Sequence, residues 1–114
     1  MAKAARKTVR IVRSSGNVFA DLDLPNAAEL DTKARLVFAI NRVRVARKLT
    51  PARTAALLEI KQPLVLALTR YRIEKFSVER LMSFVTALGC DIEIRITRPR
   101  RLTSRPGRIL VVAP

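Results

Sequence analysis

Five side chains suited to holding an anion lie within residues 53–72. They are Arg53, Lys61, Gln62, Arg70 and Arg72. Such guanidinium, ammonium and amide groups donate hydrogen bonds to phosphate oxygens in nucleic-acid complexes, where they fix the position of the protein. The residue types in this stretch therefore predict noncovalent binding of a polyanion.

The charge of the whole chain favours the same chemistry. Its 114 residues include 23 Lys or Arg and 9 Asp or Glu, which gives a formal net charge of +14. An excess of this size favours nucleic acid as the partner, followed by an anionic membrane surface and then an acidic protein. A basic surface that is merely solvated is the alternative interpretation.

The residues needed for catalysis or metal binding are scarce. The chain has no His, and its single Cys90 excludes an internal disulfide and a multi-cysteine metal site. The carboxylates of Asp21, Asp23, Glu29 and Asp31 fall in a loop and at a helix start, where negative charge favours the helix dipole. We therefore expect no enzyme activity, no metal site and no cofactor.

No membrane segment is expected either. No apolar run approaches the ~20 residues that a membrane span requires. The basic N-terminus also lacks the apolar core of a secretory signal. We expect residues 1–17 to form a basic, flexible arm, residues 18–89 a helical domain, and residues 90–114 a strand region with a basic loop.

The first predicted helix runs from the Pro25-Asn26 turn to about residue 47. Asn26 is a candidate N-cap because its side chain can accept from the first turn. Three apolar residues at helical spacing predict the buried face: Leu36, Ile40 and Val43. We expect three basic residues to lie elsewhere on the helix surface: Arg35, Arg42 and Arg47.

Residues 50–70 have the spacing of two short helices joined by a turn. Thr50 is expected to cap a helix that has Pro51 in its first position and ends at Leu58. A turn at residues 59–60 leads to a second helix over about residues 61–70. A small residue, Ala55, and four apolar residues would close the unit: Leu58, Ile60, Val65 and Leu68. This arrangement predicts a helix-turn-helix motif.

The remaining sequence predicts one more helix and then strands. Ser77 is expected to cap "VERLMSFVTAL", and Gly89 to end it in a left-handed conformation. The period then changes to two, and one face of the next strand carries Ile92, Ile94 and Ile96. With "RILVVAP" as its partner strand, this segment would form a C-terminal β-hairpin. A second copy of the chain is the expected cover for its apolar face, although the hairpin could instead fold back on its own helices.

Several segments together resemble a known family: "GNVFADLDLPNAAEL", "AINRV", "KQPLVLAL", "FSVERLMSFVTALGCDIEI" and "GRILVVAP". The chain is similar to the lambda-repressor-like, Xre-type helix-turn-helix proteins that serve as antitoxins in bacterial toxin–antitoxin modules. The resemblance implies a mainly α fold, a bundle of four to five helices followed by a short β-hairpin. It also implies a cytoplasmic, homodimeric repressor that binds operator DNA of its own operon and neutralises a partner toxin by direct binding.

The sequence departs from the family pattern in the motif itself. Family members usually carry Gly at the two turns, where this chain has Lys48 and Glu59. Their second motif helix typically reads Gln-Pro-Lys-x-Ser, whereas here Gln62 and Pro63 are followed by Leu64 and then by Leu66. Turn glycines relieve strain at positive φ. The two turns are therefore expected to be strained or differently shaped.

These departures leave three hypotheses for the second helix. In the first, it reads DNA through Arg53, Lys61, Gln62, Arg70 and Arg72, while Leu64 and Leu66 sense thymine methyl groups and DNA shape. In the second, the leucines form a protein-binding patch and operator recognition has been lost. In the third, the chain is a basic RNA-binding protein. A shifted register, with both leucines in the core, would remove the need for any of these roles.

Overall fold

The computed structural model describes residues 9–10, 27–98 and 106–113. These residues form four α-helices, α3 (Ala27–Ala46), α4 (Pro51–Leu58), α5 (Gln62–Thr69) and α6 (Val78–Ala87), together with a 3₁₀ turn, η1 (Ile73–Lys75). Two short strands, β1 (Val9–Arg10) and β2 (Val112–Ala113), pair antiparallel. The mainly helical fold with four helices is confirmed, whereas the proposed cap Asn26 and most of the basic arm lie outside the described residues.

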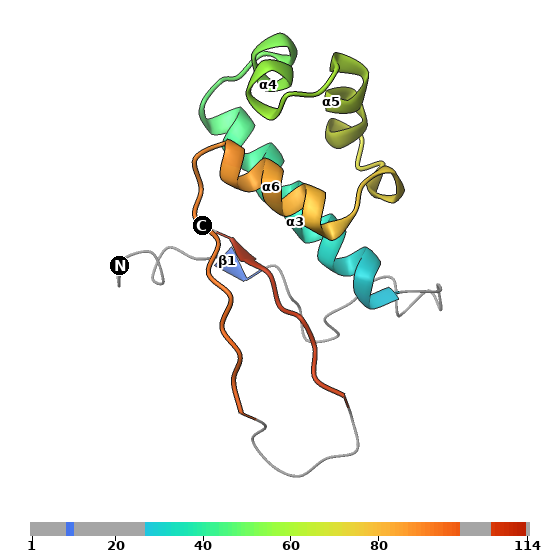
Figure 1. The fold of residues 1–114 in the computed structure, drawn as a ribbon, viewed down its shortest axis with the longest axis vertical. Coiled ribbons are helices and arrows are strands. Elements are labelled where there is room, and N and C mark those ends of the chain that lie inside the picture. The colour runs from blue at the N-terminus through green and yellow to red at the C-terminus, as the bar shows by residue number, and fades with distance from the viewer. Residues whose placement is uncertain (1–8, 11–26, 99–105, 114) are drawn as a thin grey trace.

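The core is mainly aliphatic and lies mainly between α3 and α6, which run alongside each other (Figure 1). The predicted stripe of α3 is confirmed, since Leu36 and Ile40 are buried and Val43 packs partly against the core. From α6, Leu81 is completely buried. Phe84, which the sequence reading did not single out, is also buried and contacts Phe76 edge to face at 5.8 Å between ring centroids.

The surface position predicted for Arg35 is wrong. Arg35 is only 5% exposed, and its Nε donates to a carboxylate oxygen of Asp31 at 2.6 Å. A guanidinium can enter the core when a carboxylate one turn earlier neutralises it. Arg47 is exposed at the opposite end of α3, where its guanidinium donates to the carbonyl of Leu88 at 2.7 Å and ties α3 to the end of α6.

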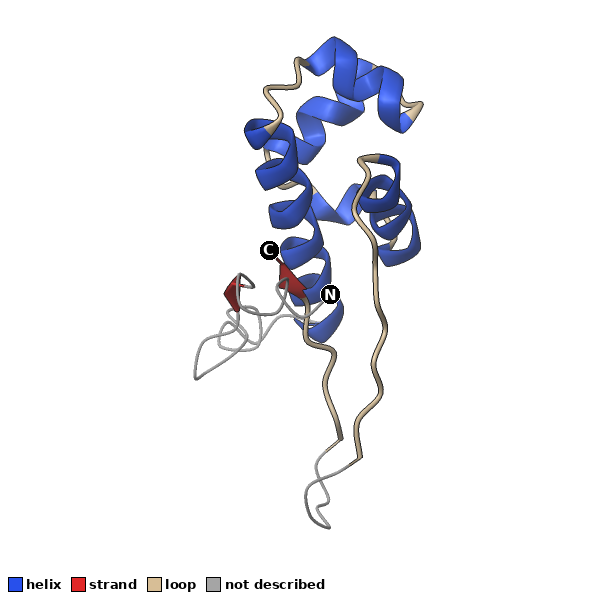
Figure 2. Ribbon diagram, turned by 90° about the vertical axis from the view of Figure 1, so that its left-hand side faces the viewer, coloured by secondary structure: helices blue, strands red, loops and turns tan. Residues whose placement is uncertain are grey.

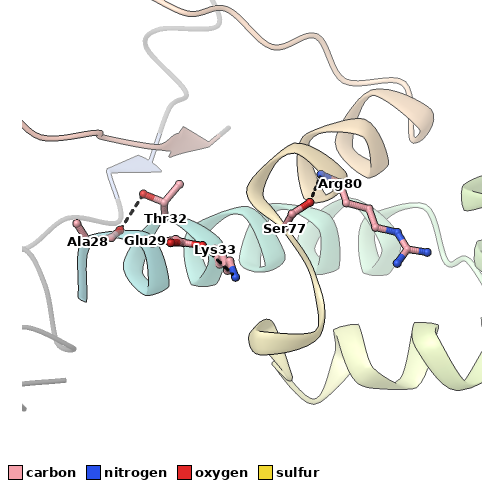
Figure 3. A network of polar contacts seen from close by, with 6 residues as sticks. All are labelled: Ala28, Glu29, Thr32, Lys33, Ser77 and Arg80. Carbon is pink, nitrogen blue, oxygen red and sulfur yellow. Dashed lines mark hydrogen bonds and ion pairs between the residues drawn. The ribbon is translucent and has the colours of Figure 1, made fainter. Parts of the chain in front are cut away.

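Side-chain caps fix the beginnings of α4 and α6, and Figure 3 shows the cap of α6. The Ser77 hydroxyl accepts from the backbone N–H of Arg80 at 3.1 Å, and Thr50 accepts from Arg53 at the same distance, so both predicted caps are confirmed. In the first turns of α3, the hydroxyl of Thr32 donates to the carbonyl of Ala28. The bonds of Ser77 and Thr50 satisfy backbone N–H groups that a helix N-terminus otherwise leaves unpaired.

Three non-glycine residues adopt left-handed backbone conformations at the helix junctions. Lys48 and Glu59, the two turn positions singled out from the sequence, have φ values of 55° and 57°. The turns therefore keep the left-handed shape that favours Gly, so they are strained rather than differently shaped. Tyr71, just after α5, is a third such position at 55°, and Gly89 ends α6 at 94° as expected.

The expected C-terminal β-hairpin does not form among the described residues, 90–98 and 106–113. Residues 91–98 are extended but belong to no strand, and the partner of Val112–Ala113 is Val9–Arg10. Figure 2 shows two loop segments, residues 91–98 and 106–111, that extend away from the helices. Alternation of apolar residues predicts a pleated segment, but a strand also needs a partner backbone and an apolar cover. The end of the chain finds its cover on the helices, where Ala113 is buried and Val111 packs partly against the core.

Two leucines of α5 provide a matched test of this packing. Leu68 is 1% exposed and Leu66 is 48% exposed, although they lie two residues apart in one helix. We expect Leu68→Ala to lower the free energy of unfolding by about 2–5 kcal/mol, because it leaves a cavity, and Leu66→Ala to lower it by less than about 1 kcal/mol. Chemical denaturation followed by circular dichroism measures both. Equal losses would show that α5 is packed in a different register.

A second test concerns the strained turn between α4 and α5. Glu59→Gly should raise the free energy of unfolding by about 1 kcal/mol, because Gly adopts a φ of 57° without steric cost. Glu59→Ala is the control, since it also removes the carboxylate but keeps the Cβ atom. Thermal unfolding should show a higher midpoint for the Gly variant than for the Ala variant. A gain shared by both would assign the effect to charge.

Candidate nucleic-acid interface

The interface is built on α4 and α5, which sit together beyond one end of α3 and α6 (Figure 1). The small residue Ala55 and the apolar Leu58 are buried in α4, and Val65 and Leu68 are buried in α5. Ile60, in the turn, packs partly against the core. These are the closing residues that the sequence predicted, and their burial confirms the helix-turn-helix arrangement.

The orientation of α5 is fixed from the inside. Val65 and Leu68 are each 1% exposed, so one face of the helix is held against the core. The side-chain amide of Asn41, from α3, also donates to the carbonyl of Leu68 at 3.1 Å. That bond satisfies a carbonyl near the C-terminal end of α5. The opposite face of the helix is consequently presented to solvent.

Four of the predicted cations are exposed: Arg53, Lys61, Arg70 and Arg72. Arg53 comes from the first turn of α4, Lys61 precedes α5, and the other two follow it. In the part of the chain that the structure describes, none of the four forms an ion pair with a carboxylate. Their charges are therefore available to an external anion.

The surrounding sequence adds to this positive field. Residues 36–73 contain eight Lys or Arg and one acidic residue, Glu59. By contrast, the described ion pairs of Lys33 and Arg35 are with Glu29 and Asp31, at the start of α3. A concentration of one charge sign on a small unit raises the local concentration of an oppositely charged ligand.

The N-terminal end of α5 is open. Lys61 is its N-cap residue, but no side-chain hydrogen bond caps the helix there. Gln62 and Pro63 follow in the first turn, and both are exposed. An uncapped helix N-terminus carries partial positive charge and suits a phosphate group. The predicted binding residue Gln62 therefore lies where an amide could reach a phosphate or a base edge.

The two leucines of α5 have different environments. Leu64 is half-buried and packs against the core, whereas Leu66 is a large apolar side chain that is 48% exposed. The alternative in which both leucines are core residues is therefore wrong, because Leu66 is exposed. Only Leu66 lies on the outer face with Gln62, so of the two leucines it alone is placed to contact a ligand directly.

The residues predicted for dimerisation lie away from this interface. Ile92, Ile94 and Ile96 are on the extended segment after α6, and their exposed fractions are 38%, 76% and 92%. The structure therefore does not bring them together with the motif. Sequence reasoning passed over Thr69, the last residue of α5, and the exposed Tyr71, which lies between Arg70 and Arg72 in the sequence. The signal for Thr69 was its position seven residues after Gln62, on the same helix face.

Among the described residues, no helix combines the length and the apolarity needed to cross a bilayer. The described residues also contain no cluster of His, Cys, Asp or Glu that could hold a metal ion.

Comparison with known proteins agrees with the geometry. Residues 18–97 match the family described as "Helix-turn-helix domain". A solved structure named "Putative XRE Family Transcriptional Regulator" superimposes with a TM-score of 0.72 at 47% sequence identity, covering 78% of this chain and 99% of that one. No curated protein matches the chain. The extent of both matches shows that the chain belongs to the XRE family of helix-turn-helix proteins.

Proposed function

We propose that this protein is a DNA-binding transcriptional regulator that represses its own operon by occupying operator DNA. The observation that carries the proposal is the exposed face of α5, bordered by unpaired cations at both ends and by an open helix N-terminus. In helix-turn-helix proteins the second helix enters the major groove and flanking residues contact phosphates. On this proposal the protein acts by binding, without catalysis or a cofactor.

Each contact residue has a role in this proposal. Arg53, Lys61, Arg70 and Arg72 bind backbone phosphates and set the register on the duplex. Gln62, at the helix N-terminus, reaches a phosphate or an adenine edge, and Gln is one of the residues that pair with adenine in the major groove.

DNA binding is tested by fluorescence anisotropy on the protein's own upstream DNA and on a scrambled duplex, each over a salt series. We expect a preference for the native duplex that persists as salt rises. Arg70→Ala should weaken binding to both duplexes, because one phosphate contact is lost. The slope of the logarithm of the binding constant against the logarithm of the salt concentration should fall in magnitude by about 1.

Arg95→Ala is the matched control, since it removes an exposed arginine that is paired with Glu93 outside the motif. It should leave both affinities nearly unchanged. If Arg70→Ala instead alters the base preference at one position, its assignment as a phosphate contact is wrong. Equal binding of wild-type protein to the two duplexes would contradict the proposal that the protein is an operator-binding regulator.

We also propose that the protein acts as a homodimer. A large apolar side chain on an isolated extended segment is unfavourable in water, and Ile92, Ile94 and Ile96 alternate along such a segment. A second copy could cover them by pairing the same segment antiparallel to itself. Two copies would also match the two half-sites of a palindromic operator.

Light scattering during gel filtration tests this assembly. We expect a mass about twice the 12.8 kDa of one chain. Ile94→Asp should shift the mass to that of a monomer, because it places a charge in the apolar seam. Val45→Asp, at an exposed apolar residue of α3, is the control and should remain dimeric. A wild-type monomer at micromolar concentration would refute the dimer.

We further propose that the protein is an antitoxin. Resemblance to antitoxin-type regulators supports it, and the proposed action is stoichiometric binding of a toxin in the cytoplasm. A short toxin-like reading frame beside the gene, and recovery of its product with the protein after co-expression, would support this role. An inverted repeat upstream of the gene would support autorepression.

A second candidate function follows from the exposed Leu66. An apolar side chain in the centre of the outer face of α5 suits a protein surface as well as a DNA groove. In this version the chain binds a toxin but does not recognise a defined operator. Binding to native and scrambled DNA that disappears together as salt rises would favour this candidate.

A further inference from the structure

The outer face of α5 has an unusual composition for a helix that reads DNA. The side chains of Gln62, Pro63 and Leu66 are exposed, while Val65 and Leu68 are buried. Residues 62, 66 and 69 are separated by four and three positions, so they lie along one side of the helix. Leu66 stands at the centre of that side.

The hydrogen-bonding capacity of this face is small. Pro63 has no polar side-chain atom, and the hydroxyl of Thr69 donates to the carbonyl of Leu66 at 2.8 Å. The donor of Thr69 is therefore used within the helix. Gln62 remains as the exposed side chain of α5 that can both donate and accept. A face with one free amide and one large apolar group cannot read several bases by hydrogen bonds.

The apolar group can recognise one feature of a base pair. In the major groove, the C5 methyl group of thymine is the apolar feature that distinguishes base pairs, and apolar side chains contact it. We infer that Leu66 is a specificity-determining residue that recognises a thymine methyl group in the operator half-site. This inference rests on the proposed function, and it assigns the central contact to Leu66 rather than to the half-buried Leu64.

The surroundings of Leu66 favour DNA over an apolar protein partner. The exposed residues that border α5 include Lys61, Arg70 and Arg72, and the nearest acidic residue in the sequence is Glu59, in the turn before the helix. Cations around a single apolar side chain match a groove in which a methyl group lies between two phosphate backbones. An apolar protein surface would leave these cations without partners.

The test replaces each thymine of the upstream operator, one at a time, by deoxyuridine. This change removes one methyl group and keeps the base pairing and the phosphates. Wild-type protein should lose about fourfold in affinity at one position of each half-site, the effect of about one buried carbon group. Leu66→Ala should bind the thymine and uracil duplexes equally at that position.

Two variants serve as controls. Gln62→Ala should weaken binding but keep the fourfold discrimination at the thymine. Val45→Ala, which truncates an exposed apolar residue of α3, should leave both affinity and discrimination unchanged. The unfolding measurement on Leu66→Ala establishes separately that the variant is folded.

The outcomes separate this inference from the proposed function. If wild-type protein prefers native DNA but no uracil substitution changes its affinity, the role proposed for Leu66 is wrong and the proposed regulator function is retained. The same holds if Leu66→Ala retains the discrimination, because another group then reads the methyl. If native and scrambled DNA bind equally and Leu66→Ala binds as tightly as wild type, both proposals fail, and Leu66 is assigned to a protein surface.

Discussion

A helix of eight residues does not persist alone in water, because too few hydrogen bonds compensate for the cost of its first turn. The existence of α5 therefore depends on burying Val65 and Leu68 against the rest of the domain. That burial also determines which residues face outward, since a rotation of the helix would expose one of the two. The hydrogen bond from Asn41 to the carbonyl of Leu68 adds a fixed point near the end of the helix. The position of every candidate contact on α5 follows from this packing.

The helical part of the fold could be predicted from local signals. Thr50, Pro51 and Ser77 are capping residues whose effect depends on neighbours three or four positions away, so the sequence locates α4 and α6 closely. These capping signals need no knowledge of distant residues. The two turn positions, Lys48 and Glu59, were identified through the family resemblance, because neither residue is glycine.

The parts that could not be predicted depend on partners distant in sequence, or on which of two nearby residues is buried. The burial of Arg35 depends on how α3 meets the rest of the domain, because its pair with Asp31 would be possible on an exposed helix as well. The pairing of Val112–Ala113 with Val9–Arg10 joins the two ends of the chain, which no local pattern indicates. The site was predicted as a set of residues, but only the structure distinguishes Leu66 from Leu64. Their difference is a rotation of about 200° around one helix axis.

The extended segment after α6 has a further consequence for how the protein behaves at high concentration. Its backbone N–H and C=O groups belong to no strand, and the side chains of Ile94 and Ile96 are largely exposed. An unpaired edge of this kind is a template for β-aggregation. Antiparallel pairing of two copies about a two-fold axis is self-limiting, whereas head-to-tail pairing continues without end and produces fibres. If two copies pair along this segment, the symmetry of the pairing would determine whether the assembly stops at a dimer or continues to grow.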